Sequence, residues 1–127
     1  MCVIGCGSFA GIFAQSIMTL RGEIDLYFAS RDLGRAQDYS SRFNGVDAFG
    51  SYESAAADPR VDALYICTPH HLHLEHATLA TQLGKHILIE KPIAGTLEDA
   101  HAIVAKAEKT GVNLMVAENY RFLSAVL

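Results

Sequence analysis

The 127-residue sequence lacks an excess of basic residues: 10 Lys and Arg stand against 14 Asp and Glu, which gives a net charge of −4. A general nucleic-acid binder needs a basic surface that neutralises phosphates, so the composition argues against that class. Half of the residues are hydrophobic and 19% are charged, which is typical of a globular protein rather than a disordered one. The length predicts one domain and is too short for two of ordinary size.

Disulfide and zinc patterns are also missing. The three cysteines, Cys2, Cys6 and Cys67, form neither an even set nor a CxxC pair. We therefore expect small buried thiols in a reducing compartment, by default the cytoplasm. No internal repeat or low-complexity segment interrupts the chain.

Residues 1–20 contain no charged residue, which raises the possibility of a secretion signal or a membrane segment. A signal peptide needs a positively charged start before its apolar stretch, and Met1 and Cys2 supply none in side chains. Glycines at positions 5, 7 and 11 interrupt a spanning helix, although Gly7 and Gly11 match the GxxxG packing motif. We expect no membrane insertion.

Short apolar runs alternate with segments of helical period along the whole sequence, which predicts an α/β fold. The runs are rich in β-branched and aliphatic residues, as in strands buried on both faces. The predicted strands are 2–4, 24–29, 46–49, 63–67, 86–89 and 113–117. Together with the intervening helices they predict a doubly wound parallel six-stranded sheet in a single domain.

Capping residues mark the ends of the predicted helices. Side chains suited to an N-cap precede three of them, at Asp32, Ser51 and Thr96. Glycines expected in the left-handed conformation follow four of them, at Gly22, Gly45, Gly84 and Gly111. The helix after Thr96 carries a predicted apolar stripe formed by Leu97, Ala100, Ile103, Val104 and Ala107.

The stretch "GCGSFA" follows the first predicted strand and leads into a helix. Gly5 permits a tight turn, Gly7 lets a pyrophosphate approach the backbone, and Ala10 keeps the helix close to the strand. The helix N-terminus offers free N–H groups to phosphates. The alternative is a small-residue turn with a structural role only, but the position of the motif favours dinucleotide binding.

The end of the second strand lacks the acidic residue that accepts hydrogen bonds from the ribose of NAD. Ser30 and Arg31 stand there instead, and a hydroxyl and a guanidinium suit a 2′-phosphate. The sequence thus favours NADP over NAD, with Arg35 either assisting Arg31 or facing water. In the alternative interpretation Arg31 is a solvated surface residue and Asp32 is the ribose ligand.

Four histidines between positions 70 and 76 suggest a metal site at first sight. His73 and His76 can share a helix face, but no third ligand has convincing spacing, and Glu75 points elsewhere on a helix. We therefore predict no metal. Simple exposure is expected for His71 and His76.

The same stretch begins where the fourth predicted strand ends, at the edge where open parallel sheets bind ligands. Thr68 and Pro69 are expected to shape that loop, with His70 or His73 reaching a ligand. The fifth strand ends in Glu90, Lys91 and Pro92 at the same edge, and we interpret the charges as ligand-facing. A surface ion pair of Glu90 and Lys91 is the alternative.

The motifs "GCGSFA", "SRDLGRA", "TPHHLH", "GKHILIEKPIAGT" and "NYRF", in this order and spacing, resemble the N-terminal Rossmann domain of the Gfo/Idh/MocA oxidoreductases. The resemblance implies a pyridine-nucleotide enzyme acting on sugars, cyclitols or related polyols. It implies that Lys91 lies beside the nicotinamide ribose and the reacting hydroxyl as the catalytic residue. It also implies nucleotide contacts for Thr68, Pro69, Glu90 and Asn119, and a place near the nicotinamide for Arg121.

The predicted cofactor site thus comprises Gly5, Gly7, Ser8, Phe9, Ala10, Ser30, Arg31, Arg35, Thr68, Pro69, His70, His73, Glu90, Lys91, Pro92, Asn119 and Arg121.

Members of that family are much longer, and their second domain forms the substrate wall. We expect residues 1–120 to be the cofactor-binding domain and residues 121–127 to begin the connection to a substrate domain that is absent. The first hypothesis is the cofactor domain of an oxidoreductase, catalytically incomplete alone. The second is a non-catalytic nucleotide-binding or scaffolding module that assembles with itself or a partner chain. Surfaces left uncovered predict a homo-oligomer.

Overall fold

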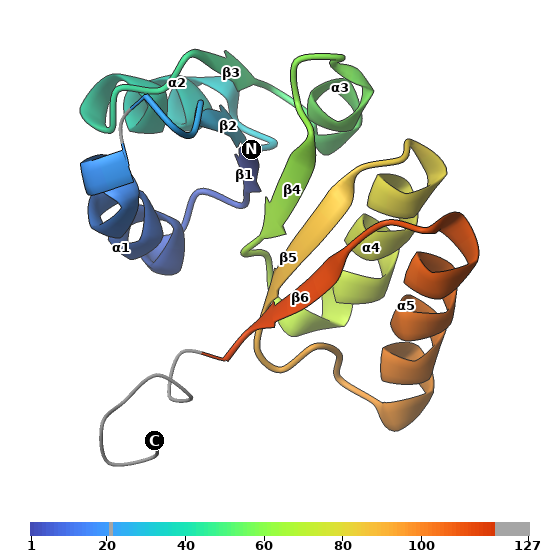
Figure 1. Cartoon of the computed structure of the whole chain (residues 1–127). Coiled ribbons are helices and arrows are strands. Elements are labelled where there is room, and N and C mark those ends of the chain that lie inside the picture. Colours follow the sequence, from blue (N-terminus) through green and yellow to red (C-terminus); the bar gives the residue numbers. More distant parts are fainter. Residues whose placement is uncertain (21, 119–127) are drawn as a thin grey trace.

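The computed structural model describes residues 1–20 and 22–118. Within them a six-stranded parallel sheet has the strand order β3-β2-β1-β4-β5-β6 (Figure 1). The strands are β1 (Cys2–Ile4), β2 (Tyr27–Ala29), β3 (Asp47–Phe49), β4 (Ala63–Ile66), β5 (His86–Glu90) and β6 (Leu114–Ala117). The order reverses between β1 and β4, so the predicted doubly wound fold is confirmed.

Strand β1 has the predicted bounds, and each of the other five strands differs from its prediction at one end, by one to three residues. Strand β2 begins at Tyr27 rather than at residue 24, whereas β5 continues to Glu90. The amide of Val46 still donates to the carbonyl of Leu26 at 2.7 Å, so sheet pairing extends beyond the regular strands. Such small shifts are expected where pairing ends gradually.

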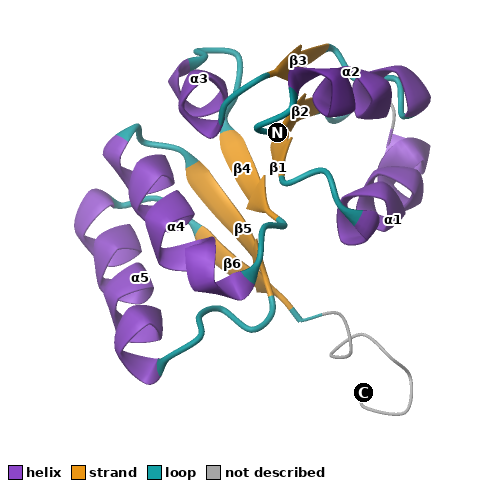
Figure 2. Cartoon of the chain, turned by 180° about the vertical axis from the view of Figure 1, so that it is seen from behind, coloured by secondary structure: helices purple, strands orange, loops and turns teal. Residues whose placement is uncertain are grey.

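Helices cover both faces of the sheet (Figure 2). One face carries α1 (Ser8–Ser16) and α2 (Leu33–Arg42), and the other carries α3 (Tyr52–Ala57), α4 (His73–Gln82) and α5 (Leu97–Thr110). Short 3₁₀ helices η1 (Ile17–Leu20) and η2 (His70–Leu72) follow α1 and precede α4. The helix residues buried against the sheet are mostly alanines, whose small side chains allow close approach: Ala10, Ala14, Ala36, Ala55, Ala56, Ala77 and Ala80.

The predicted apolar stripe of α5 is only partly buried. Ile103 and Ala107 lie in the core, but Leu97 is 74% exposed and Val104 is 40% exposed, which corrects the expectation for both. Leu97 is the first helical residue, next to the N-cap Thr96, and it lies beyond the part of α5 that packs on the core. Helix periodicity alone does not show where the neighbouring surface ends.

The N-cap predictions are confirmed, because the side chains of Asp32, Ser51 and Thr96 each accept a hydrogen bond from the amide three residues later. Gly22, Gly84 and Gly111 have the predicted positive φ angles of 87°, 68° and 75°. Gly45 does not, because Asn44 adopts the left-handed conformation instead, with a φ of 55°. A Cβ at Gly45 would lie 2.6 Å from Ser40 Oγ and 3.1 Å from the Phe28 ring, so close packing requires this glycine.

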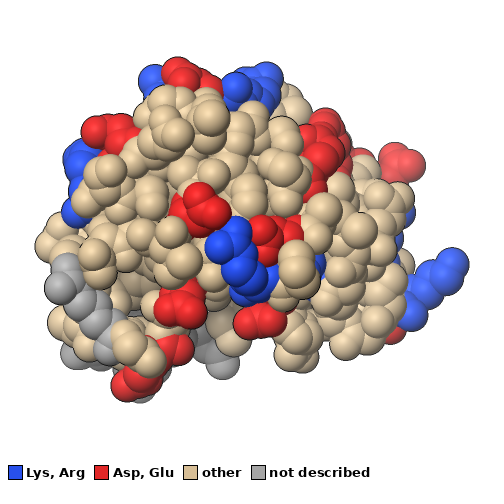
Figure 3. Space-filling view, turned by 90° about the horizontal axis from the view of Figure 1, so that it is seen from above, with Lys and Arg blue, Asp and Glu red and all other residues tan. Residues whose placement is uncertain are grey.

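One part of the sheet is not covered by any described helix. The α1 side of β5 and β6 is open in Figure 1, and the nearby side chains of Phe9, Ile12 and Met115 are 62%, 63% and 68% exposed. We call this surface, together with Val116, the apolar face. Seen from above, by contrast, Lys and Arg side chains lie beside Asp and Glu side chains (Figure 3). No described helix is long and apolar enough to cross a membrane.

Gly5 and Gly7 make a paired test of the glycine loop. Alanine at Gly5 would adopt a φ of +91° and place its Cβ 2.9 Å from Thr68 Cγ2 and 3.0 Å from Thr68 N, whereas nothing lies within 4 Å of a Cβ at Gly7. We expect Gly5→Ala to lower the free energy of unfolding by about 2 kcal/mol or more, and Gly7→Ala by less than about 1 kcal/mol. Urea denaturation measures both, and equal losses would contradict this account.

Candidate functional site

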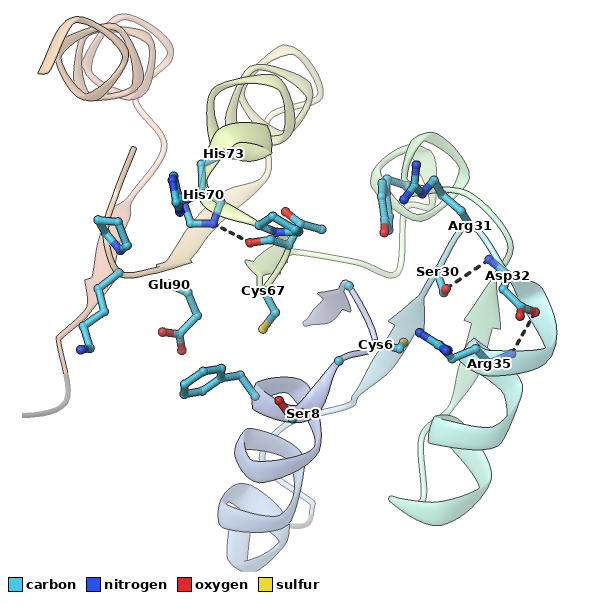
Figure 4. A pocket seen from close by; sticks show the side chains of 18 residues that line it. Cys6, Ser8, Ser30, Arg31, Asp32, Arg35, Cys67, His70, His73 and Glu90 are labelled. Atoms are coloured by element: carbon cyan, nitrogen blue, oxygen red, sulfur yellow. Dashed lines mark hydrogen bonds between the residues drawn. The ribbon is translucent and has the colours of Figure 1, made fainter. Parts of the chain in front are cut away.

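A groove of about 740 Å³ lies at the carboxyl ends of β1 and β4, where the strand order reverses (Figure 4). Neighbouring strands at this point send their following helices to opposite faces of the sheet, which leaves a crevice for a ligand. Loops after β1, β2, β4 and β5 line the groove, and Tyr52 at the start of α3 completes it. Residues far apart in the sequence are thereby collected at one edge.

The glycine loop forms the floor of the groove. Gly5 approaches the backbone of Thr68 closely, and Gly7 is the N-cap of α1 without a side-chain cap. The Tyr39 hydroxyl donates to the carbonyl of Gly7 at 2.9 Å and fixes the loop from α2. The first turn of α1 contains no acidic residue, so its N-terminus offers N–H groups and a positive dipole end to an anion.

Ala10 does not line the groove. It is fully buried between α1 and the sheet, in agreement with the packing role that the motif predicts for it. Ser8 and Phe9 do line the groove, and Phe9 also belongs to the apolar face.

Polar groups gather at the end of β2. Ser30 is buried, and its Oγ accepts a hydrogen bond from the amide of Asp32 at 3.1 Å. Asp32 Oδ1 in turn accepts from the amide of Arg35 at 3.2 Å and caps α2. The Arg35 side chain extends across the groove toward Cys6, whereas Arg31 turns toward α3 (Figure 4). Two guanidinium groups therefore flank this end of the groove.

Sequence reasoning missed Cys6, Tyr52 and Cys67 as lining residues. Burial raises the pKa of the Cys6 thiol to about 11, with Arg35 acting in the opposite direction, and burial also raises the pKa of Cys67. Burial raises the pKa of Tyr52 as well, opposed by the Arg31 guanidinium beside it. The available signal was position, since all three residues follow a strand at the ligand edge of the sheet.

The β4 loop is held by two buried histidines. His73 Nδ1 lies 3.1 Å from the carbonyl of Ile93, and its Nε2 lies 2.9 Å from the carbonyl of Thr68. His76 Nδ1 lies 2.7 Å from Thr68 Oγ1, and its ring packs edge-on against Tyr52.

His71 is exposed as predicted, but His76 is only 3% exposed, so the expectation for His76 was wrong. His76 is buried because Thr68 and the Tyr52 ring lie against it, and it shares a helix face with His73. Burial lowers the pKa of His76.

Glu90 lies at the opposite end of the groove from Arg35 (Figure 4), and Lys91 and Pro92, which follow Glu90 in the chain, also line the groove. The Tyr65 hydroxyl donates to Glu90 Oε1, and the Tyr65 ring packs on Phe13 with the ring centroids 4.1 Å apart. Burial raises the pKa of Tyr65. The peptide bond between Lys91 and Pro92 is cis.

The remaining predicted residues fall into two groups. Those that also line the groove are Thr68, Pro69 and His70. Asn119 and Arg121 lie outside the described residues. Within the described part of the chain, no three His, Cys, Asp or Glu side chains are placed to hold a metal ion.

A glycine loop on a helix N-terminus, set in the crevice of a doubly wound sheet, defines a dinucleotide-binding domain. Residues 1–118 match the family described as "Oxidoreductase family, NAD-binding Rossmann fold" (GFO_IDH_MocA), and the chain belongs to this family.

Relatives and solved structures agree with this assignment. The chain is 37% identical over 123 residues to trans-1,2-dihydrobenzene-1,2-diol dehydrogenase of Mus musculus, covering 92% of this chain and 37% of that protein. It is 39% identical over 94 residues to D-xylose 1-dehydrogenase (NADP(+)) 2 of Haloferax volcanii, and the match covers 74% of this chain and 29% of that protein. The crystal structure of an NAD-binding oxidoreductase from Klebsiella pneumoniae superposes with a TM-score of 0.89 at 29% sequence identity. The superposition covers 98% of this chain and 35% of that protein. The chain therefore spans about a third of the length of such proteins.

His76 predicts a pH dependence of stability. Its pKa is lowered from 6.5 in the folded protein, so below about pH 6.5 the unfolded chain binds a proton that the folded chain does not. The free energy of unfolding should therefore fall as the pH drops through this range. His76→Gln should reduce that fall, at a cost of about 1 kcal/mol near neutral pH for the altered contact with Thr68.

Urea denaturation at about pH 7.5 and about pH 5.5 measures the difference. His71→Gln is the matched control, because His71 is an exposed histidine of the same segment and should leave the pH dependence as in the wild type. An undiminished fall in His76→Gln would show that His76 is not the titrating group.

Proposed function

We propose that the chain is the cofactor-binding domain of an NADP-dependent oxidoreductase that acts on a sugar, cyclitol or related polyol. The observation that carries the proposal is the groove, which has the glycine loop at its centre, two arginines at one end and Lys91 at the other. An extended dinucleotide needs these three kinds of contact: phosphates on the helix N-terminus, and a recognition group at each end.

The preference for NADP rests on the end of β2. Arg31 and Arg35 supply guanidinium groups that suit a 2′-phosphate, and Ser30 supplies a hydroxyl beside them. The carboxylate of Asp32 is the obvious obstacle, since it would repel a phosphate. Asp32 lines the groove together with the arginines, but its Oδ1 accepts the amide of Arg35 as the cap of α2, which supports a structural role for this carboxylate.

Lys91 is the proposed catalytic residue. The dinucleotide, when bound, supplies the hydride acceptor or donor. Lys91 lines the groove at the end away from the arginines, where the nicotinamide half would lie. In the oxidation direction its neutral amine would accept the proton of the reacting hydroxyl, and in the reduction direction its ammonium would return a proton to the alkoxide oxygen. Glu90 is held in place by the Tyr65 hydroxyl.

We propose that cofactor binding and hydride transfer depend on different parts of the protein. The proposed cofactor contacts come from this chain, so binding should be a property of the chain by itself. Hydride transfer also requires a substrate held about 3–3.5 Å from the nicotinamide. We propose that this positioning needs the part of the relatives that the chain does not span.

Self-association through the apolar face stays a prediction, which the exposed side chains of that face support. A reducing compartment also stays a prediction, which the three free cysteines support.

Arg35 offers a direct test of cofactor choice. We expect Arg35→Ala to weaken NADPH binding by about 10- to 100-fold, because a charge-assisted hydrogen bond to the 2′-phosphate is lost, and to change NADH binding little. Isothermal titration calorimetry measures both affinities. Lys109→Ala is the control, since Lys109 is an exposed cation in the last turn of α5, does not line the groove and should not affect either cofactor. Tighter binding of NADH than NADPH by the wild type would contradict the proposed preference.

A substitution at Lys91 can distinguish an effect on cofactor binding from an effect on catalysis. We expect Lys91→Met to leave NADPH affinity within about threefold, since phosphate contacts supply most of it, and to lower NADP-dependent polyol oxidation by about 100-fold or more. Absorbance of the reduced cofactor follows the reaction in the chain joined to a substrate domain. Polyol oxidation at the wild-type rate in Lys91→Met would remove Lys91 from the mechanism.

A further inference from the structure

His73 joins two loops that line different parts of the groove. Its side chain is 1% exposed, and its two ring nitrogens face the carbonyl oxygens of Thr68 and Ile93 at 2.9 and 3.1 Å. Carbonyl oxygens only accept hydrogen bonds, so a hydrogen bond in either contact is donated by the ring. A neutral imidazole donates to one of the carbonyls, and a doubly protonated ring donates to both.

The two carbonyls belong to segments that carry proposed ligand contacts. Thr68 begins the loop after β4, and Ile93 lies two residues after Lys91 in the loop after β5. A bridge between them sets the distance between these loops on the ligand edge of the sheet. It acts on the backbone, so it does not depend on the conformation of the long Lys91 side chain.

A second contact shows that the two loops are packed closely. A Cβ at Gly95, in the β5 loop, would lie 3.1 Å from Cδ2 of His70, in the β4 loop. The imidazole of His70 thus occupies the space that a side chain at Gly95 would need. With the bridge of His73 on one side and this contact on the other, the β5 loop is held against the β4 loop at two points.

The other end of the groove is held differently. Ser30, Asp32 and Arg35 are linked by their own hydrogen bonds at the start of α2. None of the hydrogen bonds given above for His73 reaches this cluster. Removal of His73 should therefore loosen the Lys91 end of the groove and leave the arginine end intact.

We propose that His73 is a positioning residue that holds the segment from Lys91 to Ile93 at the distance from the β4 loop that the nicotinamide half of the cofactor requires. This inference rests on the proposed function for the identity of the ligand. The hold on the β5 loop rests on the contacts alone, and it can be tested without a cofactor.

Two variants and two ligands test the proposal. His73→Phe fills the space without a donor, and His73→Gln retains an amide that can donate to one carbonyl. We expect NADPH binding to weaken about tenfold in His73→Phe and by a smaller factor in His73→Gln. Binding of 2′,5′-ADP, which carries the adenosine half and the 2′-phosphate but no nicotinamide, should change by less than about twofold. Calorimetry measures both ligands, and His71→Gln is the exposed control.

Hydrogen exchange of the backbone amides at 93–95 provides the second readout, relative to amides in β1 and β4. We expect these amides to exchange faster in both His73 variants while the amides of the strands keep their protection. His73→Gln carries the test if His73→Phe does not fold.

The outcomes distinguish a failure of the positioning role of His73 from a failure of the proposed function. Equal weakening of NADPH and 2′,5′-ADP, or unchanged exchange at 93–95, would overturn the positioning role. A wild-type chain that binds neither ligand would overturn the proposed function, and faster exchange at 93–95 in the variants would still support the role of His73 in holding the loop.

Discussion

The contact between Gly5 and the backbone of Thr68 is the constraint on which the site depends. A Cβ at position 5 would lie within 3.0 Å of a backbone atom of the β4 loop, so the ends of β1 and β4 can be neighbours only because this residue is glycine. Their separation fixes the width of the crevice at the point where the strand order reverses. The loops after β2 and β5 reach the groove from this fixed centre, one on each side.

Alanines on the helices extend the same principle to the rest of the domain. Ala10 and Ala14 bring α1 onto the sheet, and Ala77 and Ala80 do so for α4. Close helices place their N-termini near the strand ends, which is where the glycine loop and the buried histidines act. Small residues therefore decide the shape of the site, although few of them would contact a ligand.

Much of this architecture could be predicted from the sequence, because buried parallel strands and capping residues leave local signals. The glycine loop, Ser30, Arg35 and Lys91 were all predicted to share one edge, since carboxyl ends of parallel strands do so by topology. What the sequence could not predict depends on contacts between distant elements. His76 is buried because Thr68 and Tyr52 lie against it. Gly45 is required because Phe28 and Ser40 leave no room for a Cβ, whereas Asn44 takes the left-handed conformation.

Leu97 illustrates the same limit from the opposite side. Its spacing matches the buried positions of α5, yet the surface against which the helix packs ends before reaching it. The periodicity of apolar residues is set by one helix alone, whereas burial also depends on the element against which that helix packs.

The hydrogen bond from Tyr39 to the carbonyl of Gly7 links α2 directly to the phosphate-binding loop. Tyr39 lies one turn after Arg35 on α2, whereas Lys91 lies in the loop after β5. A change of cofactor preference could therefore evolve within the β2–α2 unit alone, with the chemistry at the far end preserved. The same helix would transmit any distortion to the pyrophosphate, so selection for a new cofactor should tolerate changes at the exposed tip of the unit more readily than changes at Tyr39.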